Sequence, residues 1–112
     1  MIKVTFYEDS RKRLSSFFAD GHADFAEAGD DIVCSAVSAV LQAARLGLEM
    51  HLRVHVEVEQ KLGHIRITWP ETLRSDPALV AIVQTARLSV EQIARQFPAN
   101  VRCNIEPDNR VR

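Results

Sequence analysis

The chain has 112 residues, of which 46% are hydrophobic and 26% are charged, and its formal net charge at pH 7 is −1. This length suits one domain with a single hydrophobic core, and the dispersed basic residues argue against a nucleic-acid-binding surface. The first residues lack the apolar run of a signal peptide, and no later segment is predicted to cross a membrane, so we expect a soluble cytoplasmic protein.

The first twenty residues are predicted to form a β-hairpin. Hydrophobic and polar residues alternate over residues 2–7, as in a strand with one buried face. A polar turn over residues 8–12 leads to a second strand over residues 13–20. A loop over residues 21–30 then separates this hairpin from the first helix.

Two amphipathic helices are predicted. The first has Asp31 as its N-cap and Gly47 near its end, and the second has Asp76 as its N-cap, Pro77 at its first position and Pro98 as its stop. The predicted core stripes are Val33, Val37, Val40, Ala44 and Leu48 in the first helix, and Leu79, Val83, Ala86, Val90, Ile93 and Phe97 in the second.

Three further strands complete the predicted sheet. The third covers residues 50–59, a turn covers residues 60–63, the fourth strand ends at Pro70, and the fifth covers residues 101–105. The side chains expected to face the core are Met50, Leu52, Val54, Val56 and Val58 in the third strand, Ile65, Ile67 and Trp69 in the fourth, and Val101, Cys103 and Ile105 in the fifth.

The element order ββαββαβ predicts an α+β fold. Hairpins favour antiparallel neighbours and each helix has only one apolar stripe, so we expect a mostly antiparallel sheet with both helices on one face. This single domain is expected to cover residues 1–106. Residues 107–112 are expected to form a frayed C-terminal tail.

The two cysteines have different predicted environments, although both are expected to be free thiols. Cys103, on the inner face of the last strand, is expected to behave as a small apolar residue. Cys34 is placed near the start of the first helix, on the border between core and surface, where free backbone N–H groups favour a thiolate. Because His22 lies twelve positions upstream, cysteine nucleophile chemistry is one hypothesis and a packing role for Cys34 is the other.

The remaining histidines are His51, His55 and His64. Residues i and i+4 of a strand lie about 13 Å apart, too far to bind one ion together, and no carboxylate or cysteine spacing completes a tetrahedral set. We therefore interpret these histidines as a solvated sheet face or part of a subunit contact. Neither a metal nor another cofactor is expected.

The loop before the first helix has a glycine at each end, Gly21 and Gly29. Glycine permits backbone conformations that let a segment hinge, as active-site lids do when they close over a substrate. One interpretation is thus a lid hinged at these two residues. The other is an ordinary connection with turn glycines.

Two segments resemble a known family. Gly21 and His22, followed by residues 30–39 with Cys34 among them, are similar to the signature of the ribosomal-processing cysteine proteases, the Prp or YsxB-like family. A second patch resembles the second helix of that family and comprises residues 82–86, 93–94 and 97–98. The resemblance covers essentially the whole chain.

The resemblance implies a dimeric endopeptidase of the bacterial cytoplasm that removes the N-terminal extension of a large-subunit ribosomal protein. By motif position it implies Cys34 as the nucleophile and His22 as the general base. Asp31 also matches the pattern, either orienting His22 or capping the helix. The implied partner is the extension peptide, with no direct contact to nucleic acid or membrane.

Two other functions stay open. One is a non-catalytic, ribosome-associated module that binds the peptide without cutting it. The other is a thiol-based redox or acyl-carrying protein that uses Cys34 without peptide hydrolysis. The lack of a nearby resolving cysteine argues against a disulfide cycle.

Overall fold

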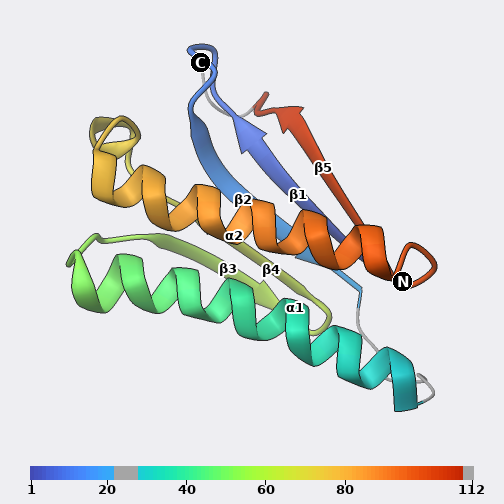
Figure 1. The fold of residues 1–112 in the computed structure, drawn as a ribbon. Helices are drawn as coiled ribbons and strands as arrows, with labels where there is room; N and C mark the ends of the chain where they lie inside the picture. Colours follow the sequence, from blue (N-terminus) through green and yellow to red (C-terminus); the bar gives the residue numbers. More distant parts are fainter. Residues whose placement is uncertain (22–27, 110–112) are drawn as a thin grey trace.

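The structure, a computed structural model, describes residues 1–21 and 28–109 and has an α+β fold (Figure 1). Its elements are β1 (Ile2–Glu8), β2 (Leu14–Asp20), α1 (Ala28–Leu46), the π-helical turn η1 (Gly47–His51), β3 (Glu57–Lys61), β4 (His64–Thr68), the 3₁₀ turn η2 (Glu71–Leu73), α2 (Pro77–Gln96) and β5 (Val101–Pro107). The predicted order ββαββαβ is confirmed.

The five strands form one sheet in the order β3-β4-β2-β1-β5. The hairpin pairs β1–β2 and β3–β4 are antiparallel, and so is the pair β2–β4, whereas β5 returns parallel to β1 after the α2 crossover. The prediction of a mostly antiparallel sheet is therefore confirmed.

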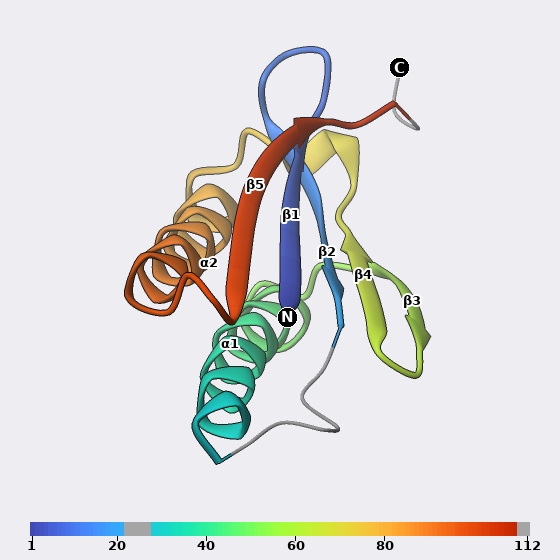
Figure 2. The same cartoon turned by 90° about the vertical axis from the view of Figure 1, so that its right-hand side faces the viewer.

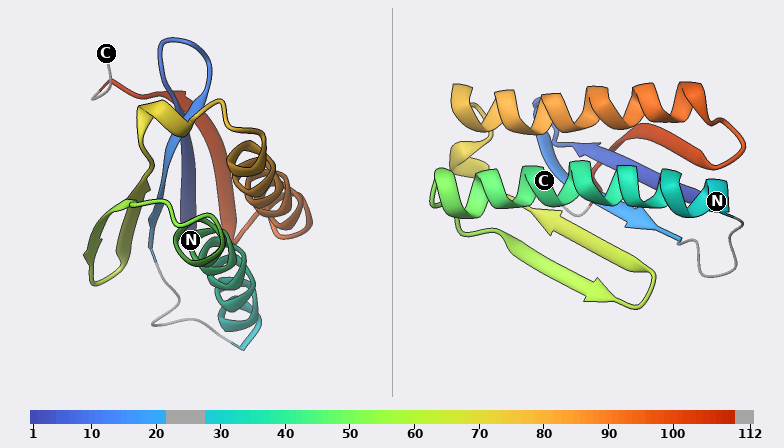
Figure 3. Two further views of the ribbon diagram at one scale, coloured as in Figure 1. Left: turned by 90° about the vertical axis from the view of Figure 1, so that its left-hand side faces the viewer. Right: turned by 60° about the horizontal axis from the view of Figure 1, so that its bottom comes forward.

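Both helices cover the same face of the sheet, and the core lies between these two layers (Figure 2, Figure 3). Trp69 is fully buried in this core, where its Nε1–H donates to the Leu14 carbonyl at 2.7 Å and its ring lies 6.2 Å from that of Phe17. Most predicted stripe residues are buried, namely Val33, Val37, Ala44 and Leu48 of the first stripe and Leu79, Val83, Ala86 and Val90 of the second.

The predicted start of the first helix is wrong, whereas its predicted end near Gly47 is confirmed. α1 begins at Ala28, so Asp31 lies inside its first turn instead of at the N-cap, and Gly29 is helical instead of at a loop end. Acidic residues are favoured both at the N-cap and in the first turn of a helix. The amino-acid type of Asp31 alone therefore could not show which of these two positions it occupies. Gly47 directly follows Leu46, the last residue of α1, and begins the π-helical turn η1. A Cβ there would lie 3.2 Å from Ile82 Cδ1, so glycine allows close approach of α2.

The predicted third strand is wrong over its first half. The helical path continues through η1, and Arg53 in the left-handed conformation, with φ 57°, follows it. Val54 and Val56 are buried in the extended segment after that turn, but Met50 and Val58 are exposed. β3 itself is a short, exposed, charged edge strand, a composition that disfavours pairing with other chains.

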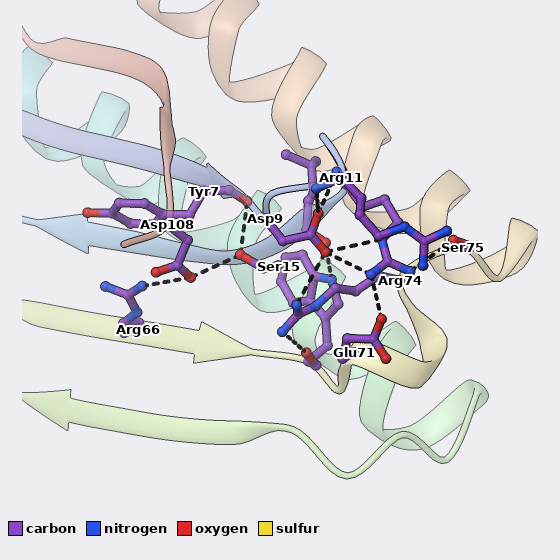
Figure 4. A network of polar contacts seen from close by, with 12 residues as sticks. Tyr7, Asp9, Arg11, Ser15, Arg66, Glu71, Arg74, Ser75 and Asp108 are labelled. Carbon is purple, nitrogen blue, oxygen red and sulfur yellow. Dashed lines mark hydrogen bonds and ion pairs between the residues drawn. The ribbon is translucent and has the colours of Figure 1, made fainter. Parts of the chain in front are cut away.

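Two predicted core residues near the ends of elements, Phe97 and Ile105, are exposed. The predicted fraying is wrong for residues 107 and 108, because β5 includes Pro107 and the Asp108 N–H donates to the Glu8 carbonyl at 2.8 Å. Residues 110–112 of the predicted tail lie outside the described residues. The carboxylate of Asp108 is buried and accepts from Ser15 Oγ at 3.0 Å (Figure 4). Buried carboxylates need such partners, which here come from distant parts of the chain.

The segment Ile32–His51 is apolar and long enough to cross a membrane, with a mean hydropathy of 1.4, contrary to the expectation from sequence. Its apolar stripe is instead buried against the sheet and α2. In the structure 28% of this window is buried, so the segment packs through one face of an amphipathic helix.

A second buried carboxylate, that of Asp9, fixes the β1–β2 turn to the segment before α2 (Figure 4). Its Oδ1 accepts hydrogen bonds from the backbone N–H groups of Arg11 and Arg13. Its Oδ2 lies 3.0 Å from a guanidinium nitrogen of Arg13 and 3.3 Å from one of Arg74. Arg13 also contacts Glu71 at 2.6 Å. The sequence interpretation described this region only as a polar turn.

Acidification is expected to weaken the fold through Asp9. Burial alone raises the pKa of its carboxyl, but the hydrogen bonds from Arg13, Arg11 and Arg74 outweigh burial and hold that pKa below 3.8. The contribution of Asp9 to stability is therefore complete above the unfolded pKa and is lost as pH falls through the folded pKa, below about pH 4. In urea unfolding, the stability difference between wild type and Asp9→Asn should shrink from pH 7 to pH 3. A difference independent of pH would contradict this account.

Candidate active site

Cys34 is the seventh residue of α1 and is partly exposed beside the hydrophobic core, as predicted. It lies one turn further into the helix than expected. Among the described residues, the free N–H groups of the helix belong to residues 28–30, so the argument that Cys34 itself lies in the first turn is wrong. Cα–Cβ bonds of a helix tilt toward its N-terminus, however, so the thiol leans toward those groups.

Cys34 lines a cavity of about 200 Å³ between α1 and the sheet. The helical wall is one face of α1, where residues recur every three or four positions and comprise Cys34, Val37, Ser38, Leu41, Gln42 and Arg45. The facing surface comes from the N-terminal end of β1, from β2 and β4, and from the β3–β4 turn. The cavity thus combines an apolar floor with polar lining residues from both α1 and the β3–β4 hairpin.

Gly21, the last described residue before the gap at residues 22–27, lines this same cavity. Its N–H donates to the Gly63 carbonyl of the β3–β4 turn at 2.9 Å. Its φ is +97°, and a Cβ at this position would lie 2.3 Å from the Met1 carbonyl oxygen. Glycine is therefore required here, for a close backbone approach as well as for the positive φ.

The other predicted site residues are described only in part. His22 lies outside the described residues, next to Gly21. Asp31 and Gly29 are placed in the first turn of α1 by their backbone alone. The structure thus brings Cys34 and Gly21 together at one cavity, and the roles of His22 and Asp31 stay predictions.

The remaining histidines do not share one strand face, contrary to the sequence interpretation. His51 belongs to η1, His55 lies before β3, and only His64 is in a strand. Alternation along β4 places the His64 ring on the face away from the helices, where its Nδ1 lies 2.7 Å from Asp20 Oδ1. Within residues 1–21 and 28–109, no group of three or more His, Cys, Asp or Glu residues is suited to hold a metal ion.

The sequence interpretation missed much of the cavity. Ser38 and Gln42 follow Cys34 at intervals of four, so helical periodicity could have identified them as lining residues. Lys61 and Gly63 could not have been found this way, because their place beside α1 depends on strand order. A hairpin next to a helix in space carries no local sequence signal.

Cys103 is half-buried between β5 and α2 and packs against the core, as predicted for a small apolar residue. Burial raises the pKa of its thiol to about 11, and Glu91 adds to this rise while Arg87 opposes it. The thiolate is the reactive form, so this cysteine is expected to be inert near neutral pH.

Iodoacetamide labelling of the Cys34→Ala variant at pH 8 should test this environment. A pKa of about 11 instead of 9.0 lowers the thiolate fraction of Cys103 about hundredfold. Alkylation should therefore be about hundredfold slower than for a solvent-exposed cysteine whose pKa is not shifted. Intact-mass time courses in buffer and in denaturant provide the measurement and its control. Equal rates in the two solvents would contradict the burial of this thiol.

Comparison with known proteins identifies similar chains over nearly the whole length. A family model described as "Cysteine protease Prp" matches residues 1–102. The Ribosomal processing cysteine protease Prp of Staphylococcus aureus strain Mu50 is 33% identical over 107 residues, which cover 93% of this chain and 98% of that protein. The protein of the same name from Bacillus subtilis strain 168 is 31% identical over 110 residues, covering 91% and 95%.

A solved structure also has the same fold. It is the crystal structure of an essential ribosomal processing protease Prp from S. aureus in complex with a covalently linked product peptide. The TM-score is 0.78 at 29% identity, and the match covers 94% of this chain and 99% of that one. That relative therefore binds a peptide.

Proposed function

The chain belongs to the Prp family of ribosomal processing cysteine proteases, and on this premise we propose that Cys34 is its nucleophile and His22 its general base. One observation carries this proposal: Cys34 and Gly21, the residue before His22, line the same cavity. A nucleophile and its base must lie within hydrogen-bond reach, and the position of Gly21 at the Cys34 cavity, directly before His22 in the sequence, supports this pairing.

The proposed reaction is acyl transfer. The His22 imidazole accepts the proton of Cys34, and the thiolate attacks the scissile carbonyl carbon to give a tetrahedral oxyanion. Collapse of this intermediate breaks the C–N bond, and the imidazolium donates its proton to the leaving amine. Water, deprotonated by the same imidazole, then hydrolyses the thioester and releases the second peptide.

The first turn of α1 supplies the proposed oxyanion donors. Its N–H groups lack helical partners, and the helix dipole favours negative charge beside them. Residue 30, the last with a free N–H, lies about 6 Å along the helix axis from Cys34, toward the end to which the thiol leans. Donors fixed by a helix need no reorganisation when the charge develops.

Asp31 is proposed to orient His22. Asp31→Asn should then lower kcat by about tenfold or more, with a smaller change in KM, and should shift the acidic limb of the kcat/KM profile, because the carboxylate stabilises the imidazolium. The neighbouring Asp30→Asn is the matched control and should leave the profile unchanged. Wild-type turnover by Asp31→Asn would refute the orienting role.

The proposed substrate is the N-terminal extension of a large-subunit ribosomal protein, cut in the bacterial cytoplasm. The support is that the curated relatives are named ribosomal processing proteases. Intact-mass analysis of the source organism's own ribosomal protein after incubation with the enzyme should show one cut at the end of the extension. Binding without cutting would instead favour the non-catalytic peptide-binding module.

The active form is proposed to be a homodimer. Supporting this, two large hydrophobic side chains remain exposed at the C-terminal end of the helical path, Leu46 of α1 and Met50 of η1. Burial of such side chains between two copies would remove apolar surface from water. Sedimentation velocity should give twice the chain mass of 12.6 kDa, and a single-chain mass at all concentrations would contradict the proposal.

A further inference from the structure

The tip of the β3–β4 hairpin stands opposite α1 across the Cys34 cavity, and we propose that Leu62 at this tip is a specificity-determining residue that contacts an apolar side chain of the bound peptide. This inference rests on the proposed protease function, because it takes the cavity as the peptide site. It adds a recognition contact outside the catalytic residues.

The residues on both sides of Leu62 line the cavity: Gln60, Lys61, Gly63 and His64. Leu62 lies between them and is 90% exposed, more than any other large hydrophobic side chain in the described chain. Single exposed apolar residues are common and need no explanation by themselves. Here the position matters, because the residue stands at the rim of the nucleophile's cavity.

Turn chemistry does not account for this leucine. Lys61 pairs with His64, so the connection is a two-residue turn of Leu62 and Gly63, in which Gly63 has φ +81°. Glycine is the residue that such a positive φ favours, but short hairpin turns otherwise favour Asn, Asp or Gly. A large apolar side chain gains nothing from the turn itself, whereas it would gain from contact with a bound apolar group.

The hairpin tip is also fixed relative to the catalytic end of the cavity. The Gly63 carbonyl accepts the N–H of Gly21, which precedes His22. Figure 3 shows the tip directed toward the end of the molecule at which α1 begins. Leu62 is thus held near the scissile bond, so its partner is an apolar peptide side chain close to the cut.

The cavity has the shape for an extended peptide. Its helical wall runs from Cys34 to Arg45, eleven residues or about 16 Å along α1, which equals about five residues of extended chain. Its floor includes the apolar Val37, Leu41 and Ile65. A peptide lying on this floor would place side chains between α1 and the hairpin tip, where Leu62 covers one of them.

The test compares Leu62→Ser with Leu88→Ser, an exposed leucine of α2 away from the cavity, as the matched control. Both side chains are exposed, so melting temperatures should stay unchanged. The substrates are twelve-residue peptides spanning the ribosomal protein's cleavage site, with each large apolar residue near the cut replaced in turn by serine. Leu62→Ser should lower kcat/KM about tenfold, mainly through KM, and Leu88→Ser should not.

One peptide of the set lacks the apolar side chain that contacts Leu62. With this peptide the wild type and Leu62→Ser should have the same kcat/KM, because the apolar contact is lost in both proteins. The same fold-change should appear in the Kd of the parent peptide for Cys34→Ala, with and without Leu62→Ser. This binding readout does not depend on turnover.

Three outcomes would overturn the inference. If the wild type cuts the peptide and Leu62→Ser does so equally well, the inference fails and the protease function stands. If Leu62→Ser changes the sedimenting mass, the residue belongs to a subunit contact. If the wild type neither binds nor cuts any peptide of the set, the proposed substrate class and the inference fail together.

Discussion

Replacing Cys34 with alanine is expected to lower kcat for peptide cleavage by about 10⁴-fold or more. Alanine cannot form the thioester, and in the described part of the chain Cys34 is the only thiol that lines the cavity. Cys34 is partly exposed and small, so stability should change little. Product formation by mass spectrometry and a thermal melt measure the two effects.

The matched control for this experiment is Cys103→Ala. Cys103 packs between β5 and α2, away from the cavity, so its replacement should leave kcat/KM within about twofold of the wild type. Some stability should be lost, because a core contact is removed. Rapid cleavage by Cys34→Ala, or loss of cleavage in a folded Cys103→Ala, would contradict the assignment of the nucleophile.

Replacing Trp69 with alanine is expected to cost about 3–5 kcal/mol of unfolding free energy. Its side chain is fully buried, its ring contacts Phe17, and loss of its N–H leaves the Leu14 carbonyl without that donor. A domain of this size commonly has only about 5–15 kcal/mol in total. Urea unfolding should therefore show a large shift of the midpoint.

The exposed Leu88 provides the control for this loss. Leu88→Ala removes a side chain that is 56% exposed and should change the unfolding free energy by about 0.5 kcal/mol or less. A similarly small effect for Trp69→Ala would mean that the core between β2, β4 and the helices is not packed as described.

Stabilising polar contacts and the candidate catalytic residues occupy opposite ends of β2. Asp9 and Arg13 lie before Leu14, where the strand begins, and Arg74 contacts Asp9 there, whereas Gly21 follows the last residue of the strand. Seven strand residues separate the ends by about 23 Å. Substitutions around Asp9 should thus alter stability more than the kinetics of cleavage.

The element order and fold class could be predicted because they depend on local patterns. Alternating residues defined β1, and Asp76 with Pro77 defined the start of α2, where the Asp76 side chain accepts the N–H groups of Ala78 and Leu79. The parallel pairing of β5 with β1 has no such signal, because it joins strands about a hundred residues apart.

The errors in element limits share one physical cause, competition between local patterns. Residues 50–59 alternate as a strand should, but the helical path of α1 and η1 extends into them and leaves Met50 exposed. At the other end, acidic residues suit both a cap and a first turn, so the start at Ala28 was not evident. In each case tertiary packing, which local sequence does not show, determined where the helix begins or ends.

The candidate site was predictable only on its helical side. Cys34 could be placed on α1, at the border of the core, from helical periodicity. The facing wall required the position of β4 beside β2 and the hydrogen bond from Gly21 to Gly63, which no local pattern encodes. The same holds for Asp108, whose buried carboxylate reaches Ser15 across 93 positions.

Peptide mapping of a covalent adduct would test the assignment of Cys34 most directly. The protein is treated at pH 7 with a peptide that matches the substrate up to the cleavage site and ends in a thiol-reactive group, and the adduct is located by tandem mass spectrometry. We predict one adduct per chain on Cys34, with loss of cleavage in proportion to labelling. Labelling of Cys103 instead, or full cleavage by the labelled protein, would contradict the account.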